Sequence, residues 1–368
     1  MKFKTNKNSF LNGVNVVSKA IPTNTTMDIL KYIKINASNG VIKLLANDMD
    51  LAIETIIEGE IIENGEVALE ANKLNVVLRS LPDNELIIET NDKKQVVITY
   101  DTVKNSNSCI NYLSTDDFPD LPSYEKENPI IISQFSLKEL IRTTIFSIAD
   151  NETNKIMTGE LFEIKGNELK VVSLDGHRIS IRKSELKNSY NDTSVIVPGK
   201  ALKELIKILN NEIDNDVTIY INKNNIVFEF DENIIISRLI EGEYFKIDHM
   251  LSSNYTVKVN VNKKDLLDGI NRAVPFVHEG EKKPVRFNFE NDSLTLSITS
   301  LEGGNNDYIN IEKEGNDVLI GFNPKFIIDA LKVIDEETVS LYMINSKAPC
   351  FIKNENESFI YLILPVNL

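Results

Sequence analysis

The sequence has few of the residues from which enzymes and metal proteins build reactive sites. It contains two cysteines, Cys109 and Cys350, and three histidines, His177, His249 and His278. A zinc site would need Cys or His ligands paired at short spacing, and such pairs are absent. We therefore expect two buried free thiols, no metal site and no cofactor.

Sequence motifs for catalysis are also missing. There is no Gly-x-Ser-x-Gly elbow, no Walker phosphate loop and no Gly-x-Gly-x-x-Gly turn. Carboxylates are numerous but scattered, without the acidic pattern of a two-metal nuclease. A structural or surface role suits Asp175 and His177 better than catalysis. We expect no catalytic residue, and a hydrolase or nuclease that uses Asp175 and His177 is the alternative from another functional class.

Long apolar runs are lacking as well. No stretch reaches the roughly 20 apolar residues that cross a bilayer. The N-terminal residues 1–7 are followed by no apolar signal core. These absences predict a cytoplasmic protein without a membrane partner.

What the chain has in excess is negative charge. Its 55 acidic and 40 basic residues give a formal net charge of -15. Taken alone, this charge argues against nucleic acid, because phosphates repel an acidic protein. Net charge does not locate the charges, however, so a basic surface enclosed by an acidic exterior is compatible with it. The length of 368 residues predicts two or three domains, at roughly 100–200 residues each.

A helical pattern occurs three times along the chain. Residues 6–20, 136–149 and 262–276 each begin with a good N-cap residue, namely Asn6, Ser136 and Asn262, and continue with apolar residues at helical spacing. Ser136 and Glu139 also match a capping box. We expect three related amphipathic helices.

Two further elements recur in the same order. A polar turn between two apolar runs lies near residues 48, 175 and 302, and it predicts a hairpin or a tight strand connection. A second helix follows, with a lysine near its start at Lys73, Lys200 and Lys325, and alternating strands come after it.

This order predicts an α+β fold of three tandem copies, each with helices on one face of antiparallel sheets. Polar breaks at residues 119–129 and 241–254 place the domains at residues 1–127, 128–250 and 251–368. Chance similarity, inflated by abundant Asn, Ile and Lys, is the alternative interpretation.

The helices of each copy carry much of the positive charge, whereas acidic residues gather in strands and loops. If all helices face one way, they form a basic track that binds phosphates without reading bases and with a strong salt dependence. Ordinary solvated helix faces are the alternative. The candidate DNA-binding residues on these helices are Lys73, Arg79, Lys138, Arg142, Lys200, Lys203, Lys207, Lys264, Arg272, Lys325 and Lys332.

The C-terminal segment Phe359–Leu368 is strongly apolar. A closing strand of the last sheet explains Phe359–Leu362 but explains Leu364–Val366 less well, because chain ends usually fray in water. An exposed apolar patch there would mark a partner-binding surface.

Several short motifs, in this order and within a threefold repeat of this length, resemble one family over essentially the whole chain. That family is the β subunit of bacterial DNA polymerase III, the sliding clamp. The motifs are Asp117-Phe-Pro-Asp-Leu121, Leu174-Asp-Gly-His-Arg-Ile179, Ser194-Val-Ile-Val-Pro198, Gly321-Phe-Asn323 and Leu364-Pro-Val-Asn-Leu368.

The resemblance implies a non-catalytic subunit of the DNA polymerase III holoenzyme. Two chains would close head to tail into a ring around duplex DNA, with the helices facing the DNA. Such a clamp keeps the polymerase near the primer end by raising its effective concentration. The implied partners are duplex DNA of any sequence, the replicative polymerase, the clamp loader and other proteins with a clamp-binding motif. A clamp-like adaptor that binds replication or repair partners without encircling DNA is the alternative.

By position, the resemblance also implies two interfaces. The ring would close between the first domain of one chain and the third domain of the other, through Lys104, Ser106, Ser108, Ile110, Pro275, Phe276, Ser293, Thr295 and Ser297. Partner peptides would bind between the second and third domains, at Met157, Leu174, Gly176, His177, Arg178, Ile179, Phe245, Met250, Leu362, Leu364, Pro365 and Val366.

Four positions depart from the family pattern. Asn24 and Asp28 stand in a stretch that often holds arginine and proline in the family, which weakens an expected DNA contact. Gly199 stands where a basic residue is common and leaves Lys200 as the nearby cation. Phe245 stands where the family often has proline, so the edge of the pocket would differ in shape.

Overall fold

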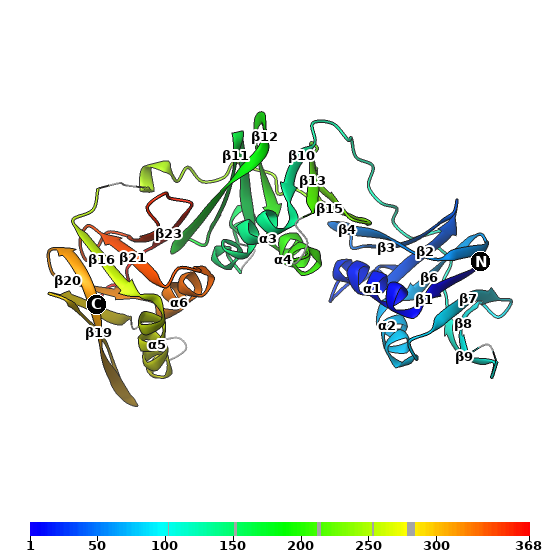
Figure 1. Ribbon diagram of the computed structural model, residues 1–368, viewed down its shortest axis with the longest axis horizontal. Helices are drawn as coiled ribbons and strands as arrows, with labels where there is room; N and C mark the ends of the chain where they lie inside the picture. Colours follow the sequence, from blue (N-terminus) through cyan, green and yellow to red (C-terminus); the bar gives the residue numbers. More distant parts are fainter. Residues whose placement is uncertain (102, 151–152, 212–214, 252–253, 278–283) are drawn as a thin grey trace. The chain divides into compact units, whose positions relative to one another are not determined.

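We describe a computed structural model of the chain, which covers residues 1–101, 103–150, 153–211, 215–251, 254–277 and 284–368 (Figure 1). His278 lies outside these described residues. The chain forms two compact units, and each is described by itself. Unit 1 comprises Met1–Phe135 and Lys200–Leu239, and unit 2 comprises Ser136–Gly199 and Ile240–Leu368. No helix in the described ranges has the length and apolar composition needed to cross a bilayer.

Unit 1 is built mainly from antiparallel strands. They are β1 (Lys2–Asn6), β2 (Tyr32–Ser38), β3 (Val41–Asn47), β4 (Leu51–Ile57), β5 (Glu60–Glu63), β6 (Gly65–Glu70), β7 (Glu85–Asn91), β8 (Gln95–Asp101), β9 (Ser106–Asn111), β10 (Ile130–Ser133), β13 (Asp216–Ile221), β14 (Asn225–Phe230) and β15 (Asn233–Arg238). One sheet has the order β5-β1-β7-β8-β9, and the other has the order β10-β13-β14-β15-β4-β3-β2-β6. Buried and half-buried residues alternate along β2, as expected of a sheet with one core face.

The helices of unit 1 are α1 (Lys7–Val17), α2 (Ala71–Ser80) and most of α4 (Gly199–Ile208). The buried face of α1, which includes Phe10, Gly13 and Val14, packs on β3 and β4, and α1 also contacts α2. A Cβ atom at Gly13 would lie 2.5 Å from Cγ2 of Ile57, so a glycine is needed for this close approach.

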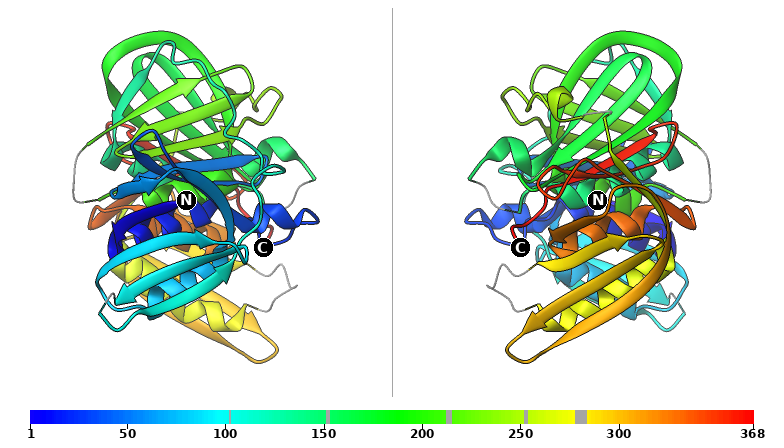
Figure 2. Two further views of the ribbon diagram at one scale, coloured as in Figure 1. Left: turned by 90° about the vertical axis from the view of Figure 1, so that its right-hand side faces the viewer. Right: turned by 90° about the vertical axis from the view of Figure 1, so that its left-hand side faces the viewer.

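Unit 2 contains one large antiparallel sheet with the order β11-β12-β23-β22-β21-β16-β19-β18-β17-β20. Its strands are β11 (Gly159–Leu174), β12 (Arg178–Pro198), β16 (Val257–Asn262), β17 (Val285–Glu290), β18 (Ser293–Ser300), β19 (Gly303–Gly315), β20 (Val318–Phe322), β21 (Thr338–Met343), β22 (Cys350–Lys353) and β23 (Phe359–Ile363). Its helices are α5 (Lys263–Ala273), α6 (Pro324–Val333) and most of α3 (Gln134–Arg142). The helix α5 packs on β18 and β19 (Figure 2).

One hydrogen bond confirms the threefold repeat directly. This bond recurs once in each copy. Its donor is the backbone N–H of the first residue of the copy's first helix, which is α1, α3 or α5. Its acceptor is the carbonyl of the residue just before the strand that follows the copy's second helix. The three bonds are Lys7 to Asn84 (3.0 Å), Gln134 to Asn215 (2.7 Å) and Lys263 to Glu337 (2.8 Å). Copy 1 therefore contains α1 and α2, copy 2 contains α3 and α4, and copy 3 contains α5 and α6.

The expected helix starts are confirmed in copies 1 and 3 but not in copy 2. Asn6 and Asn262 accept backbone N–H groups as N-caps. Ser136 is not an N-cap, because α3 already begins at Gln134. The fully buried Gln134 side chain bonds Asp231 and the N–H of Asn210, which fixes the earlier start. The capping box was therefore wrong too, and the Glu139 carboxylate instead holds Arg142.

The three expected hairpins are confirmed: β3–β4, β11–β12 and β18–β19 each surround one of the predicted polar turns. At the matching position of these turns, Met49, Gly176 and Gly303 have φ values of 79°, 86° and 137°. This backbone region favours glycine, so Met49 is the strained member of the set.

The apolar C-terminus has a structural role that the sequence analysis underestimated. Val366 forms a β-bridge with Gly321, just as Leu113 does with Ala68 and Ile240 with Ile196. The terminal segment is thus the third copy of the stretch that leads, in copies 1 and 2, into the linkers between copies. For the thiols, burial is confirmed for Cys350 and wrong for Cys109, which is exposed on the edge strand β9.

Candidate partner pocket, DNA-facing helices and ring seam

The predicted partner pocket lies within unit 2, on one face of the large sheet. Leu174 of β11 pairs with Ile179 of β12, Ile179 pairs with Leu362 of β23, and Leu362 pairs with Phe351 of β22. Directly paired residues on neighbouring antiparallel strands share a face, so these four apolar side chains form one row.

This row is the floor of a partly covered apolar cluster. Leu174, Ile179 and Leu362 are at most 5% exposed. Met157, Met250 and Leu364 pack on the same cluster but are only partly buried. Half-covered apolar side chains above a buried apolar floor suit an apolar ligand.

The turn between β11 and β12 borders this cluster. Oδ1 of Asp175 accepts the N–H groups of His177 (3.0 Å) and Arg178 (3.2 Å). Gly176 and His177 are exposed. The carbonyl of His177 accepts the N–H of Leu364 at 2.9 Å. This last bond ties the C-terminal segment, with the half-buried Pro365 and Val366, to the turn.

Two aromatic residues that the sequence analysis missed belong to the same region. Phe326 of α6 stacks on His177, with ring centroids 5.9 Å apart and planes at 20°. Tyr244 packs on the apolar cluster, donates its hydroxyl to the carbonyl of Val172, and has its pKa raised by burial. Phe326 lies beside the buried stripe of α6, so helical periodicity gives no signal for its role.

Tyr244 also supports the predicted pocket residue Phe245. Their rings meet edge to face with centroids 6.1 Å apart, and Phe245 remains 39% exposed. The position that departs from the family pattern therefore presents an aromatic face to solvent.

Arg178, which the sequence analysis placed in the pocket wall, is a buried residue at 6% exposed. Its guanidinium bonds Asp175, Asp329 and the carbonyl of Phe146. The side chain therefore lies behind the turn and is occupied within unit 2.

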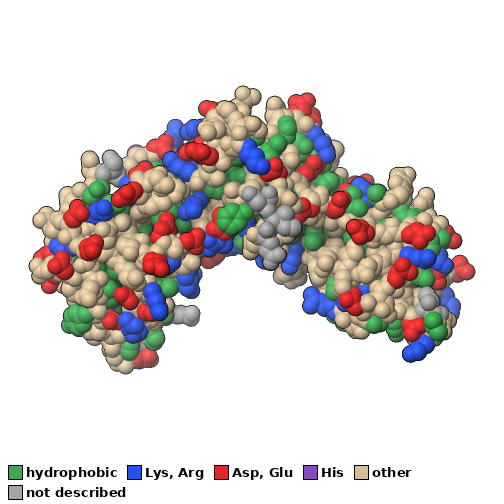
Figure 3. Space-filling model, viewed as in Figure 1, with side chains coloured by type: hydrophobic (Ala, Val, Ile, Leu, Met, Phe, Trp, Pro, Cys, Tyr) green, Lys and Arg blue, Asp and Glu red, His purple; other side chains and the backbone are tan. Residues whose placement is uncertain are grey.

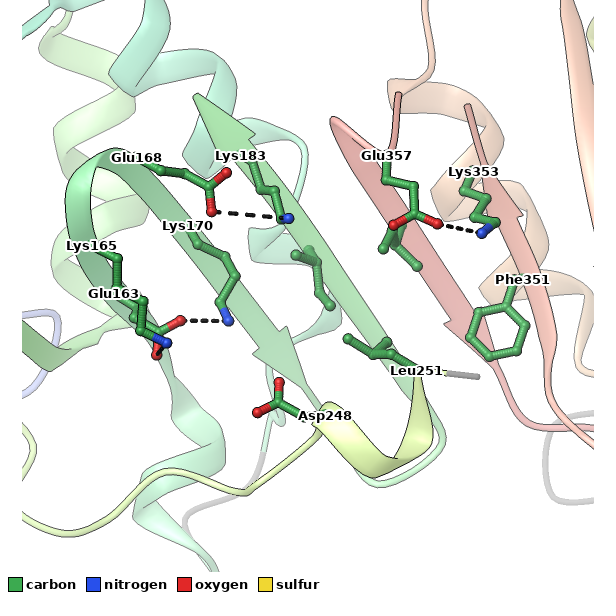
Figure 4. A pocket seen from close by; sticks show the side chains of 12 residues that line it. Glu163, Lys165, Glu168, Lys170, Lys183, Asp248, Leu251, Phe351, Lys353 and Glu357 are labelled. Carbon is green, nitrogen blue, oxygen red and sulfur yellow. Dashed lines mark hydrogen bonds and ion pairs between the residues drawn. The ribbon is translucent and has the colours of Figure 1, made fainter. Parts of the chain in front are cut away.

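A cavity of about 240 Å³ adjoins the same apolar cluster (Figure 4). Ile181, Leu251, Phe351 and Ile360 belong to both. Its four lysines are each paired with a glutamate of the rim: Lys165 and Lys170 with Glu163, Lys183 with Glu168, and Lys353 with Glu357. Asp248 also lines the cavity, so four carboxylates balance the four lysines and the rim offers no excess of one sign to a ligand.

The candidate DNA-binding residues of unit 1 lie on α2 and α4. Lys73 and Lys203 are exposed, and Arg79 bonds the amide oxygens of Asn75 and Asn15. Lys200 is ion-paired with Asp48, and Lys207 with Glu204. The lysine side chains are 64% exposed at Lys200 and 51% exposed at Lys207, so phosphate groups can compete for them with Asp48 and Glu204.

The candidates of unit 2 lie on α3, α5 and α6. Lys264, Lys325 and Lys332 are exposed. Arg142 is held by Glu139, and Arg272 is held by Asp307. Lys138 is half-buried, and desolvation lowers its pKa. Figure 3 shows acidic and basic side chains intermixed on the visible face of each unit.

The residues predicted for the ring seam occupy different environments. Lys104 is exposed, Ser106 and Ser108 are half-buried, but Ile110 is only 4% exposed and packs in the core of unit 1. In unit 2, Phe276 is half-buried and Pro275 exposed. The strand β18, with Ser293, Thr295 and Ser297, lies between β17 and β19 and so has no free edge.

Two strand edges that have no strand partner among the described residues bear on the seam. The strand β9 pairs only with β8. The strand β19 pairs with β18 along residues 303–310 and with β16 only from Ile311 onward, which leaves the other edge of residues 303–309 without a partner among the described residues. Backbone pairing at a seam is thus available from β19, not from β18 as the sequence analysis implied.

Comparisons with known proteins agree with this architecture. Three family models match in order: the N-terminal domain of the DNA polymerase III beta subunit at residues 1–122, its central domain at residues 131–246 and its C-terminal domain at residues 249–367. The beta sliding clamp of Staphylococcus epidermidis is 33% identical over 377 residues, which span 100% of this chain and 99% of that protein.

Solved structures are similar over the whole chain. A DNA polymerase III beta subunit from Eubacterium rectale has a TM-score of 0.96 and 56% identity, with 100% of this chain and 99% of that chain covered. The DNA polymerase sliding clamp of Bacillus subtilis has a TM-score of 0.95 and 30% identity at the same coverage. The resemblance inferred from the sequence motifs and the expected α+β fold of three clamp domains are therefore confirmed. The chain belongs to the family of bacterial DNA polymerase III β subunits, the β sliding clamps, which are non-catalytic processivity factors of DNA replication.

Proposed function

We propose that this chain forms a head-to-tail homodimeric ring around duplex DNA and tethers the replicative polymerase, the clamp loader and other proteins through the apolar pocket of unit 2. The domain boundaries at residues 1–127, 128–250 and 251–368 and the cytoplasmic location belong to this proposal. The observation that carries it is the pairing of strands between successive copies, which leaves one matching pair of edges open.

Within the chain, two junctions join the copies. At junction 1, the pairing of β4 with β15, Thr55 is opposite Asn233 and Leu51 is opposite Ser237. At junction 2, the pairing of β12 with β23, Arg182 is opposite Phe359 and Arg178 is opposite Ile363. Each junction therefore joins the strand after a copy's hairpin turn to the last strand of the next copy.

The third such pair consists of the same two kinds of strand, but the two strands are not paired with each other within the described part of the chain. The hairpin strand of copy 3 is β19, and the last strand of copy 1 is β9. The repeat spacing places Ser106 opposite Ile309 and Ile110 opposite Asn305 of a second chain. A contact between two different surfaces of identical chains gives a closed ring when the rotation closes, so two chains with three copies each suit a C2 ring.

The outward faces of these two strands support the same arrangement. At junctions 1 and 2, linkers cover apolar pairs such as Ala52 with Ile236 and Ile179 with Leu362. The corresponding faces of β9 and β19 carry the exposed residues Cys109, Asn306 and Tyr308. A mostly polar face is what a junction without a covering linker requires.

The register can be tested by a disulfide. In the proposed seam Cys109 lies directly opposite Asn306 of the other chain, so the Asn306→Cys variant should form a covalent dimer under mild oxidation. The control is Leu319→Cys, which adds an exposed thiol on β20 away from the seam. A covalent dimer in the control but not in Asn306→Cys would exclude this register.

The DNA contact is tested on circular substrates. A loaded ring should remain on nicked circular DNA and be lost once the circle is linearised, and its solution mass should be twice the chain mass. Neutralising Lys138, Arg142, Lys200 and Lys203 together should reduce retention, because non-specific binding depends on phosphate contacts. A monomeric chain that is never retained on circles would contradict the ring, and DNA association that depends neither on a closed circle nor on these four residues would favour a clamp-like adaptor.

The pocket is tested with a labelled peptide that carries the clamp-binding motif of the polymerase. Substituting Leu364→Ala should weaken this binding and leave the dimer intact. This variant is a cleaner test than deletion of Leu364–Leu368, because deletion also removes the bridge from Val366 to Gly321. Unchanged peptide affinity would show that the pocket is assigned wrongly.

A further inference from the structure

The buried arginine behind the pocket turn connects several segments of unit 2. Nε of Arg178 donates to Oδ2 of Asp175 at 2.9 Å, Nη1 donates to Oδ2 of Asp329 at 2.7 Å, and Nη2 donates to the carbonyl of Phe146 at 2.5 Å. Each guanidinium nitrogen therefore bonds a different segment: the turn, the helix α6 and the short helix at Ile145–Ser147.

The same guanidinium also contacts an aromatic ring that reaches the surface of the pocket region. Cζ of Arg178 lies 4.6 Å from the ring centroid of Phe326, and this ring stacks on the exposed His177. Cation–π contact favours one position of the ring over others. The orientation of His177 is thus linked to Arg178 through Phe326.

A second link runs through the backbone. Asp175 uses Oδ2 for the guanidinium and Oδ1 for the N–H groups of His177 and Arg178, which closes the turn. The carbonyl of His177 then holds the N–H of Leu364. Three parts of the pocket region, namely the turn, the C-terminal segment and α6, are thus tied to one buried side chain.

The rest of the chain offers an internal comparison. The residue of copy 1 that corresponds to Arg178 is the buried Leu51. The turn of copy 1 closes in the same way, because Oδ1 of Asp48 accepts the N–H groups of Asp50 and Leu51. An arginine is therefore not needed to fold this turn. Buried ion pairs are also weak contributors to stability compared with apolar residues of similar volume.

We infer that Arg178 is a positioning residue of the partner pocket: it does not touch the partner, but holds His177, Phe326 and Leu364 in the arrangement that binds an apolar peptide. This inference rests on the proposed function of the pocket. It assigns to Arg178 a role different from that of the wall residues.

The first variant to test is Asp329→Ala, which removes only the α6 end of the bridge. Its matched control is Asp317→Ala, because Asp317 pairs with Lys313, whose side chain is 6% exposed, the same value as for Arg178. The probe is a fluorescent peptide with the clamp-binding motif of the polymerase. We expect a Kd roughly tenfold higher for Asp329→Ala and an unchanged Kd for the control, both measured well below the thermal unfolding midpoint of each variant. An unchanged Kd for Asp329→Ala would overturn the inference.

A second readout does not depend on the peptide. The chain has three histidines, so the ring signals of His177 can be identified in NMR spectra by comparison with His177→Gln. In Asp329→Ala and in Arg178→Leu, which installs the side chain found at position 51, these signals should shift as the ring leaves Phe326. Unmoved His177 signals in Asp329→Ala would overturn the inference. Failure of the wild-type protein to bind the peptide would instead reject the proposed function.

Discussion

Junction 1, where β4 pairs with β15, and junction 2, where β12 pairs with β23, are built by the same strand pairing but are covered differently. Over junction 1 and the adjoining strands of copy 1, the first linker packs Phe118, Leu121 and Tyr124 onto the sheet. Over junction 2, the second linker leaves Met250 half-exposed and Phe245 at 39% exposed. The repeat thus provides two similar apolar surfaces. Each linker buries one apolar side chain, Phe118 or Ile247, and the second linker differs by leaving Phe245 exposed.

The turns beside the two junctions also differ, in the ion-pair partner of their aspartate. Asp48 is paired with the exposed Lys200 of α4, whereas Asp175 is paired with the buried Arg178, which continues to Asp329 of α6. One carboxylate position is therefore paired with an exposed lysine in one copy and with a buried arginine in the next.

The largest expected effect comes from removing the buried residue of the first linker, Phe118, which packs on Leu45 and Ala68 beside junction 1. The change Phe118→Ala should lower the free energy of unfolding by about 3 kcal/mol, because Phe118 is 5% exposed and its loss leaves a cavity. The change Phe245→Ala should lower it by less than about 0.5 kcal/mol. Urea unfolding followed by tyrosine fluorescence measures both, and similar losses would show that the two linkers cover their junctions equally.

The next effect concerns the anchor of the first linker. The hydroxyl of Tyr124 bonds Glu229, and burial, followed by this bond, raises the pKa of Tyr124 to about 12. Replacing Tyr124 by phenylalanine should cost about 1.5 kcal/mol at neutral pH. Since the pKa is raised on folding, this advantage of the wild type is complete below about pH 10 and is lost as the pH rises through about 12. A stability difference that stays constant from pH 8 to 12 would contradict this assignment.

A smaller effect is expected from the strained turn of copy 1. Met49 has a φ of 79° where copies 2 and 3 have glycine. The change Met49→Gly should raise stability by up to about 1 kcal/mol, and the reverse change Gly176→Met should lower it. Thermal unfolding of the two variants compares them, and a loss of stability in Met49→Gly would mean that the methionine side chain contributes more than the strain costs.

The smallest effect is expected where Asp48 is paired with the exposed Lys200 of α4. The change Lys200→Ala should cost about 1 kcal/mol at low salt and less at high salt, because Lys200 is 64% exposed, and the 4% exposed Asp48 carboxylate keeps its bonds to the N–H groups of Asp50 and Leu51. The change Asp329→Ala on α6 provides the comparison, since its partner Arg178 of junction 2 is buried. Equal salt dependence of the two losses would show that burial does not distinguish the two pairs.

Much of the fold could be predicted from local patterns. Asn6 and Asn262 mark the starts of α1 and α5 because a cap is a short-range hydrogen bond. The start of α3 could not be predicted, because it depends on the buried Gln134, which bonds Asp231 and Asn210 far along the chain.

In the candidate site, too, some features could be predicted from the sequence and others could not. Leu174, Ile179 and Leu362 could be selected by resemblance, and strand register brings them into one row. Neither the burial of Arg178 nor its stacking on Phe326 could be predicted, since both depend on where α6 packs. The free edge of β19 likewise depends on the order of strands in the sheet, which the sequence pattern does not contain.

The polar outward face of β9 and residues 303–309 has a thermodynamic consequence for the proposed ring. Junctions 1 and 2 close within one chain, so their populations do not depend on protein concentration. The third joint is bimolecular and has neither a linker nor an apolar cover to stabilise it. Dilution should therefore separate the two chains at their two equivalent seams while both internal junctions of each chain stay closed, because the strands that no linker covers are the ones that part.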